Sequence, residues 1–160
     1  MPGPLSITLN TTGATTALPL FEKDSTVRCA FVKVEQDKND KGDFLSFQFK
    51  TLDPAPAVGG REINTGFPVF KRVFLYDKNT PPGQVPERAV SDIARIQDAC
   101  LGTGDKENDK GKPERPPFGV ECIPDMVNKE VFITFTLKPN QEGVDQNEIK
   151  SIKFPGDVQA

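Results

Sequence analysis

The side chains that usually carry enzyme chemistry are scarce in this sequence of 160 residues. It contains no histidine, which excludes a Ser–His or Cys–His nucleophilic pair, an imidazole base and the usual zinc sites. The three cysteines, Cys29, Cys100 and Cys122, are far apart, odd in number and outside any C-x-x-C motif, so we expect buried free thiols. We therefore expect no enzyme, no bound metal and no other cofactor.

Two segments match a functional motif only in part. The polar turn 37–43 begins like a calcium loop, but Lys41 stands where that loop needs an oxygen ligand and Gln48 where it needs a bidentate acid. Gly102-Thr103-Gly104 is not followed by the G-K-[ST] of a phosphate-binding loop. A hairpin turn and a helix end explain these segments better, and a nuclease that uses carboxylate-bound metal remains a third alternative.

Aromatic residues, in contrast, are plentiful, with twelve phenylalanines and one tyrosine. Side chains alternate along an extended strand, so the segment FPVFKRVFLYDK has two different faces. One face carries Phe70, Arg72, Phe74 and Tyr76, and the other carries Val69, Lys71, Val73 and Leu75. Rings beside cations are what proteins use to stack the bases and meet the phosphates of single-stranded nucleic acid. The alternative is that these rings belong to the core and that the helix covers the aliphatic face.

Because the net charge of the chain is negative, any basic groove that binds nucleic acid must be local. Its net charge is −3 and its isoelectric point is near 5.1, which is unlike a globally basic nucleic-acid binder. The segment 61–76 nevertheless has three cations and one acid, a local charge of +2, and phosphates interact with charges only over about 10 Å. The candidate phosphate contacts are Lys50, Arg61, Lys71, Arg72, Lys150 and Lys153.

The hydrophobic periodicity predicts five strands and one helix. The strands are expected over 25–36, 44–52, 61–76, 131–137 and 147–154, with a helix over 87–101 and a short extended piece at 120–123. The first two strands should form a hairpin, and the third should bend at Gly66 and Pro68. This order is that of the OB-fold, an all-β, five-stranded Greek-key barrel with one helix between the third and fourth strands. An open sandwich or an α+β sheet fits the same elements.

The alternation also predicts which residues face the core. In the second strand the core face is Leu45, Phe47 and Phe49, and Phe44, Ser46, Gln48 and Lys50 form a wetter face. In the first strand we expect Ala30, Val32 and Val34 in the core. In the helix we expect an apolar stripe that begins at Val90 and runs through Ile93 to Cys100.

The chain is expected to hold one domain. Residues 1–24 are expected to be a flexible lead-in, residues 25–155 the domain and residues 156–160 a short tail. The first twenty residues lack the features of a signal peptide, and no segment approaches the ~20 apolar residues of a membrane span. We therefore expect an intracellular protein without a membrane partner.

Four short motifs, in this order along the chain, resemble a family of bacteriophage single-stranded-DNA-binding proteins, first catalogued as a domain of unknown function. They are Gly60-Arg61, Asp98–Gly102 (DACLG), Asn128–Val131 (NKEV) and Asn147–Pro155 (NEIKSIKFP). The resemblance covers residues 26–155. It implies an OB-like barrel that coats single strands without sequence preference and has no enzymatic activity, and it places Arg61 and Lys150 at the family's basic positions.

The resemblance also implies a biological setting and partners. The setting is phage DNA replication and recombination in the host cytoplasm. The expected partner is single-stranded DNA, and phage replication or recombination enzymes and a second copy of the chain are further candidates. The alternative function is a protein-interaction or virion-associated module that does not bind nucleic acid.

Overall fold

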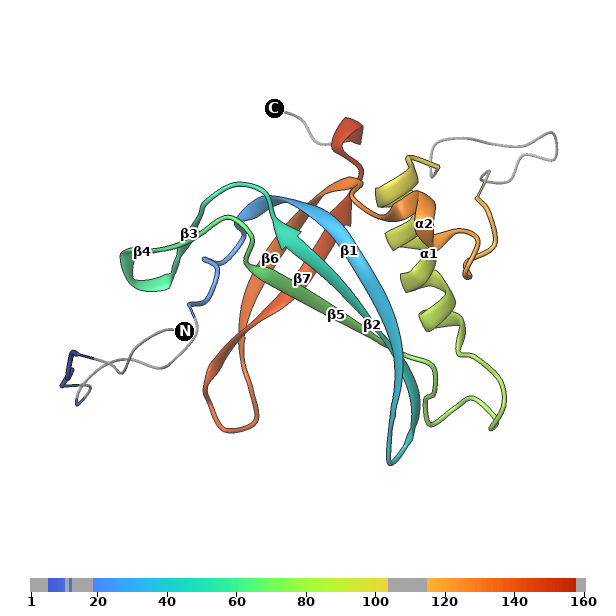
Figure 1. Cartoon of the computed structure of the whole chain (residues 1–160). Coiled ribbons are helices and arrows are strands. Elements are labelled where there is room, and N and C mark those ends of the chain that lie inside the picture. The colour runs from blue at the N-terminus through green and yellow to red at the C-terminus, as the bar shows by residue number, and fades with distance from the viewer. Residues whose placement is uncertain (1–5, 11, 13–18, 104–114, 158–160) are drawn as a thin grey trace.

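The sheet and the helix of the protein follow the expected mostly-β plan. The computed structural model describes residues 6–10, 12, 19–103 and 115–157. Its five strands form one open antiparallel sheet, in the order β5-β2-β1-β6-β7 (Figure 1). They are β1 (Thr26–Asn39), β2 (Gly42–Thr51), β5 (Pro68–Phe74), β6 (Glu130–Pro139) and β7 (Asp145–Lys153). Strands β5 and β7 are the two edges, and no ladder joins them in the described part of the chain.

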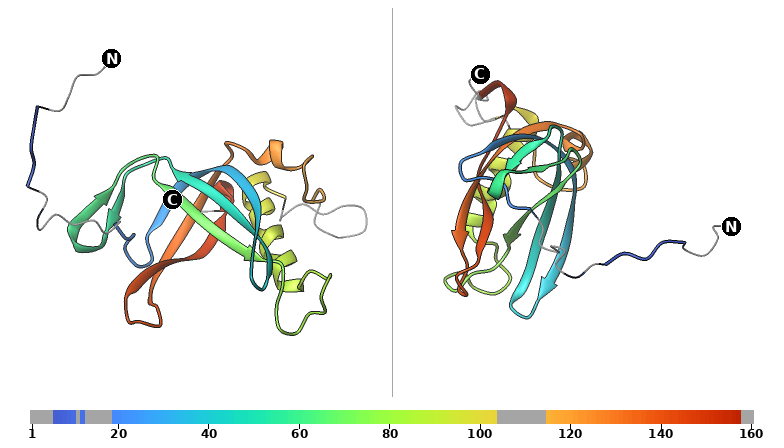
Figure 2. Two further views of the ribbon diagram at one scale, coloured as in Figure 1. Left: turned by 60° about the horizontal axis from the view of Figure 1, so that its bottom comes forward. Right: turned by 90° about the vertical axis from the view of Figure 1, so that its left-hand side faces the viewer.

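The sheet is strongly curved. The β1–β2 and β6–β7 hairpins diverge toward their tips, as two further views show (Figure 2). Helix α1 stands beside the sheet at one end, and a small second sheet projects at the opposite end (Figure 1). The expected hairpin between the first two strands is confirmed, because β1 and β2 pair from Cys29↔Thr51 to Asn39↔Gly42.

The expectation of one long strand over 61–76 is wrong. The chain first forms the small sheet from β3 (Ala55–Ala57), the 3-10 turn η1 (Val58–Gly60) and β4 (Arg61–Ile63), and it enters β5 only at Pro68. The turn between β4 and β5 is held by the fully buried Thr51. Its hydroxyl donates to the carbonyl of Asn64 and accepts from the N–H of Phe67, both at 3.0 Å. The interruption falls at the expected bend, because Gly66 has a φ of +88° and β5 begins at Pro68, and a polar residue of β2 holds the turn.

Helix α1 (Glu87–Leu101) has the predicted bounds. It ends at Gly102, whose φ of +69° suits glycine, and a Cβ there would lie 2.8 Å from the ring of Phe154. Its buried side includes Ala89, Ile96 and Cys100 and packs against β5, β6 and β7. The expected start of the apolar stripe is wrong, because Val90 is 55% exposed.

The segment that returns from α1 to the sheet is pinned to the helix by an ion pair. The Arg115 guanidinium donates to both carboxylate oxygens of Asp98 at 2.7 and 2.6 Å, and the Thr103 hydroxyl donates to the same carboxylate at 2.6 Å. Burial alone would raise the pKa of Asp98, but the hydrogen bonds from Arg115 and Thr103 outweigh it and lower that pKa. Residues 120–122 form a turn where an extended piece was expected. The short helix α2 (Ile123–Met126) follows, and Pro124 suits its first turn.

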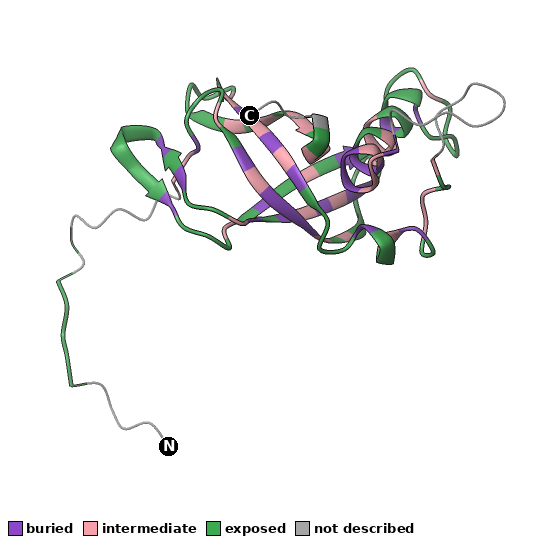
Figure 3. Ribbon diagram, turned by 90° about the horizontal axis from the view of Figure 1, so that it is seen from above, coloured by how far each residue is buried: buried purple, intermediate pink, exposed green. Residues whose placement is uncertain are grey.

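The core lies on the inner face of the sheet, the face that α1 covers at one end. Phe31, Phe47 and Phe49 are fully buried there, and the alternation of buried and exposed positions along the strands is visible in Figure 3. The faces expected for β2 are confirmed. The expectation for β1 is right in part, because Ala30 is 3% exposed and Val34 packs against the core. It missed Cys29 and Phe31, which are fully buried. A bulge between Phe31 and Lys33 shifts the register, so these two lie on the core face before the shift and Val34 lies there after it.

Part of the expected lead-in belongs to the fold. Phe21 is 3% exposed and stacks on Phe135, with ring centroids 4.0 Å apart and planes 5° from parallel. It also bridges to Ala57 of β3. Residues 1–5, 11, 13–18 and 158–160, which include half of the expected lead-in and most of the expected tail, lie outside the described part. The last described residues form the 3-10 turn η2 (Pro155–Asp157). None of the helices in the described ranges has the length and apolar character needed to cross a bilayer.

Candidate nucleic-acid interface

The rings expected to stack bases lie outside the core. We call the side of β1, β2 and β5 that is turned away from the core the outer face. In β5, Val69 and Val73 are buried on the inner face, whereas Phe70 is 57% and Phe74 36% exposed. Paired residues of neighbouring strands share a face, and β2 adds a parallel row to the outer face. The pairs are Lys50↔Pro68, Gln48↔Phe70, Ser46↔Arg72 and Phe44↔Phe74.

The rings at the hairpin end of the outer face contact one another. The centroid of Phe74 lies 5.8 Å from that of Phe44 and 5.6 Å from that of Tyr76. The guanidinium carbon of Arg72 lies 5.2 Å from the Phe44 centroid, within the range of a cation–π contact. Phe44 is therefore buried to 8% exposure although it belongs to the wetter face of β2. This end of the face is a packed aromatic surface.

The position of Tyr76 depends on the β1–β2 hairpin. Its hydroxyl accepts a hydrogen bond of 2.9 Å from the Asn39 side-chain amide. Its ring lies so close to Gly42 that a Cβ there would be 2.7 Å from Cδ1. Gly42 also has a φ of +151°, which disfavours other residues. The hairpin therefore packs against Tyr76 and fixes its ring at the end of the aromatic row.

The outer face carries two cations that no described acid neutralises. Neither Lys50 nor Arg72 takes part in an ion pair within the ranges that the structure covers. Lys33, on the same face of β1, instead pairs with Glu35 at 2.8 Å. Asp37 lies toward the hairpin tip, opposite Phe44, whereas the acids nearer to Arg72 and Lys50 are already paired, Glu35 with Lys33 and Glu130 with Arg28. The positive charge left on this face is that of Lys50 and Arg72, on either side of Phe70.

Arg28 is also on this side of the sheet, but its charge is already used. It donates to Asp53 at 2.9 and 3.0 Å and to Glu130 at 3.0 Å. The hydrogen bond to Asp53 is the main reason that the pKa of Arg28 is raised, and the same bond lowers the pKa of Asp53. This triad ties β1 to β6 and to the chain after β2, so we assign it a structural role.

The other predicted basic residues do not gather on the outer face. Arg61 lies on β4, in the small sheet that projects from the other end of the molecule (Figure 1). Lys150 lies on β7, 3.5 Å from Asp24, and Lys153 lies at the end of β7 opposite Phe132. Lys71 lies opposite the buried Phe47 in the β2–β5 ladder, so its side chain leaves the backbone on the inner face of β5. The structure brings together Lys50, Phe70, Arg72, Phe74 and Tyr76.

Two hollows adjoin the outer face, and sequence reasoning missed both. The first, of about 590 Å³, lies between the edges β5 and β7 and is lined by residues that include Phe70 and Arg72. The second, of about 1190 Å³, lies between the hairpin and the loop 77–86 and is lined partly by Phe74 and Tyr76. Its basic lining residues are Lys41, Lys78 and Arg88. These cations come from the hairpin turn, the loop after β5 and the first turn of α1, so the sequence does not indicate that they lie close together.

The loop at the second hollow is ordered by Asp77. Its carboxylate accepts a hydrogen bond of 2.9 Å from the N–H of Asn79. Hydrogen bonding from Thr80 is the main cause of a lowered pKa for Asp77. Asp77 is thus ionised at neutral pH and partly offsets the cations of this hollow.

The thiols of the described part are buried and unreactive, and its acids are not clustered. Cys29, Cys100 and Cys122 are all buried and unpaired. Burial, the largest cause, raises the pKa of Cys29 and of Cys100 to about 12, so both remain protonated at neutral pH. No group of three Cys, Asp or Glu residues within the described ranges is placed to hold a metal ion.

Comparison with known proteins adds no relative. A scan against models of known protein families finds none that matches this chain. A search of curated proteins finds no significant match either. The arguments about function that follow therefore rest on the geometry of the outer face and on the resemblance noted from the sequence.

Proposed function

We propose that the protein binds single-stranded DNA on the outer face of β2 and β5, largely without sequence preference and without enzymatic activity. The observation that carries this proposal is the exposure of Phe70 and Phe74 on one face of an edge strand, with Arg72 between them. Every base has a π-face, so stacking on exposed rings tolerates any sequence. Cations beside the rings would meet the phosphates.

The expected fold agrees with this choice of face. We propose that the curved sheet and α1 form an OB-like, partly open barrel, a fold whose second and third strands present the face that binds oligonucleotides. In this sheet those strands are β2 and β5, counted along the chain. The loop between the first two strands also takes part in such folds, and here it supports Tyr76 through Asn39.

The proposed biological role follows from the resemblance to phage single-strand binders. The protein would act in phage DNA replication and recombination inside the host cell, where it would coat single strands and meet the enzymes of those processes. Arg61, Lys150 and Lys153 are too dispersed to be part of the central contact. We therefore place the contact on Phe70, Arg72, Phe74, Tyr76 and Lys50.

The test is binding of a labelled oligo-dT, measured by fluorescence anisotropy at two salt concentrations, with duplex DNA of the same length as the competitor. We expect the single strand to bind more tightly than the duplex. The two cations of this contact, Lys50 and Arg72, predict that log K falls with log salt with a slope of roughly −1.4, at about 0.7 per phosphate contact. Absence of oligo-dT binding at low salt refutes the proposal and leaves a protein-interaction module as the better explanation of the exposed rings.

A further inference from the structure

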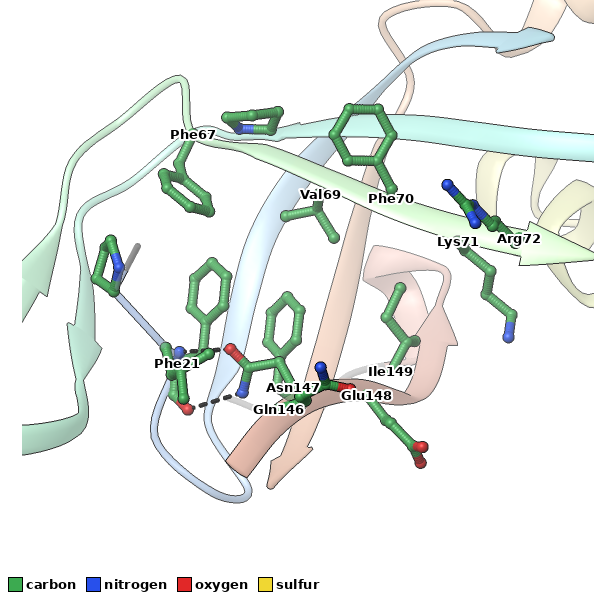
Figure 4. Close-up of a pocket in the computed structure, with 14 residues that line it drawn as sticks. Phe21, Phe67, Val69, Phe70, Lys71, Arg72, Gln146, Asn147, Glu148 and Ile149 are labelled. Carbon is green, nitrogen blue, oxygen red and sulfur yellow. Dashed lines mark hydrogen bonds between the residues drawn. The ribbon is translucent and has the colours of Figure 1, made fainter. Parts of the chain in front are cut away.

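The cleft between the two sheet edges has the size and the lining of a ligand site. It encloses about 590 Å³ between β5 and β7 (Figure 4), within the roughly 300–1,000 Å³ of small-molecule sites. The N-terminal segment reaches its floor through Phe21, and Val69, Phe135 and Ile149 also line it. These residues come from four separate parts of the chain, so only the fold creates the site.

The floor of the cleft is flat, apolar and held in place. Phe21 and Phe135 are stacked in parallel, and Phe67 meets Phe21 edge to face at 5.8 Å. The Asn147 side chain fixes Phe21, because its Oδ1 accepts from the Phe21 N–H at 2.7 Å and its Nδ2 donates to the Phe21 carbonyl at 2.9 Å. Phe21 and Phe135 are 3% and 2% exposed and close the bottom of the cleft, so the apolar surface open to a ligand is that of the partly buried Phe67 and Ile149. A preformed apolar wall of this kind favours a planar ring as the ligand.

The rim of the cleft is positively charged. Lys71 and Arg72 point to opposite faces of β5, but β5 is an edge strand and both side chains line the cleft (Figure 4). Neither is ion-paired within the ranges that the structure covers. The acid of the opposite wall, Glu148, is paired with Lys138 at 3.4 Å. The unbalanced charge therefore favours an anion beside the planar ring.

We propose that this cleft holds one nucleotide of the bound single strand, with its base against Phe67 and Ile149, above the Phe21–Phe135 floor, and its phosphate beside Lys71 and Arg72. This assignment rests on the proposed function and deepens it. Phe70 and Arg72 belong both to the outer face and to the lining of the cleft. A single DNA strand that crosses the outer face past Phe70 thus reaches the cleft without leaving the protein surface. The base that enters the cleft no longer stacks with the bases bound on the outer face.

The first test fills the mouth of the cleft. Gln146 lines it from β7, whereas its neighbour Asp145 does not, and both residues are exposed. We expect Gln146→Trp to weaken oligo-dT binding about tenfold, the value of one stacked base, and Asp145→Trp to change it less than twofold. Unchanged urea-unfolding midpoints control for folding, and Lys71→Gln, which removes a rim cation without adding bulk, serves as the second variant.

The second test uses deoxythymidine monophosphate as the probe and follows amide chemical shifts of the wild-type protein. Shifts at Asn147 and Ile149 that inorganic phosphate alone does not produce support the cleft as a nucleotide site. Shifts confined to Phe74 and Tyr76, or reproduced by inorganic phosphate, overturn it. Equal oligo-dT affinities for Gln146→Trp and Asp145→Trp overturn the cleft assignment alone, whereas wild-type protein that does not bind oligo-dT overturns the proposed function as well.

Discussion

Truncation of Phe70 separates base stacking from fold stability. Phe70 is 57% exposed, so about four-tenths of the side chain is covered. Complete burial of a phenylalanine is worth roughly 1.5–3 kcal/mol, so Phe70→Ala should lower the free energy of unfolding by only about 1 kcal/mol. A stacked base is worth about 1–3 kcal/mol, so the same substitution should raise the Kd for oligo-dT about 5- to 150-fold.

Two further variants make the interpretation specific. Phe70→Tyr keeps the ring and should bind within about twofold of wild type. Phe49→Ala removes a fully buried ring of the neighbouring strand and should cost about 3–5 kcal/mol of stability. Urea unfolding measures the stabilities, and anisotropy of labelled oligo-dT at low salt measures the affinities.

Two results would refute the stacking argument. One is an unchanged Kd for a folded Phe70→Ala protein, which would mean that no base contacts this ring. The other is a Phe70→Tyr protein that binds oligo-dT as weakly as Phe70→Ala, which would mean that the aromatic ring at this position does not contribute to binding by stacking. In either case the exposed rings would need a different partner.

Three other substitutions test separate parts of the structure. Arg72→Gln should reduce the salt slope of oligo-dT binding by about 0.7, whereas Arg61→Gln, on the distant small sheet, should leave it unchanged; anisotropy over a salt series decides, and equal slopes for the two variants contradict the assigned face. Thr51→Val should lower the free energy of unfolding by about 1–2 kcal/mol, because two partly buried backbone groups lose their partner; a urea midpoint equal to that of wild type contradicts the role given to this hydroxyl. Arg115→Met should destabilise the protein by about 1–2 kcal/mol at pH 7. Because the pKa of Asp98 is lowered in the folded state, this difference should be present above the ordinary aspartate pKa of about 4 and disappear as the pH falls through the folded value; urea unfolding at pH 7 and pH 3 measures it, and a pH-independent difference contradicts the ion pair as its cause.

Local patterns in the sequence determine much of this protein. Glu87–Leu101 is a helix with the predicted bounds, because its apolar period, its start after Pro86 and its stop at Gly102 are all local signals. The period of two along β5 likewise places Val69 and Val73 on one face and Phe70 and Phe74 on the other. Such features depend only on residues close together in the sequence, so the sequence alone predicts them.

Which face of a strand is buried depends instead on distant residues. The rings of β5 are exposed because α1 and the core phenylalanines of β1 and β2 occupy the inner side, and the same alternation would suit the opposite arrangement. In β1 a bulge after Phe31 shifts the core face, and bulges are set by pairing with a partner strand. The buried hydroxyl of Thr51 similarly holds the turn that interrupts the expected third strand.

The candidate site shows the same division. Phe70, Arg72, Phe74 and Tyr76 follow from one strand and its period of two, so the sequence alone identifies them as a group. The separation of Arg61 from that group, the partnership of Lys50 with it and the cleft floored by Phe21 and Phe135 arise only from tertiary structure. The physical reason is that periodicity is a local property of the chain, whereas burial and clefts are formed by segments far apart in sequence that fold against one another.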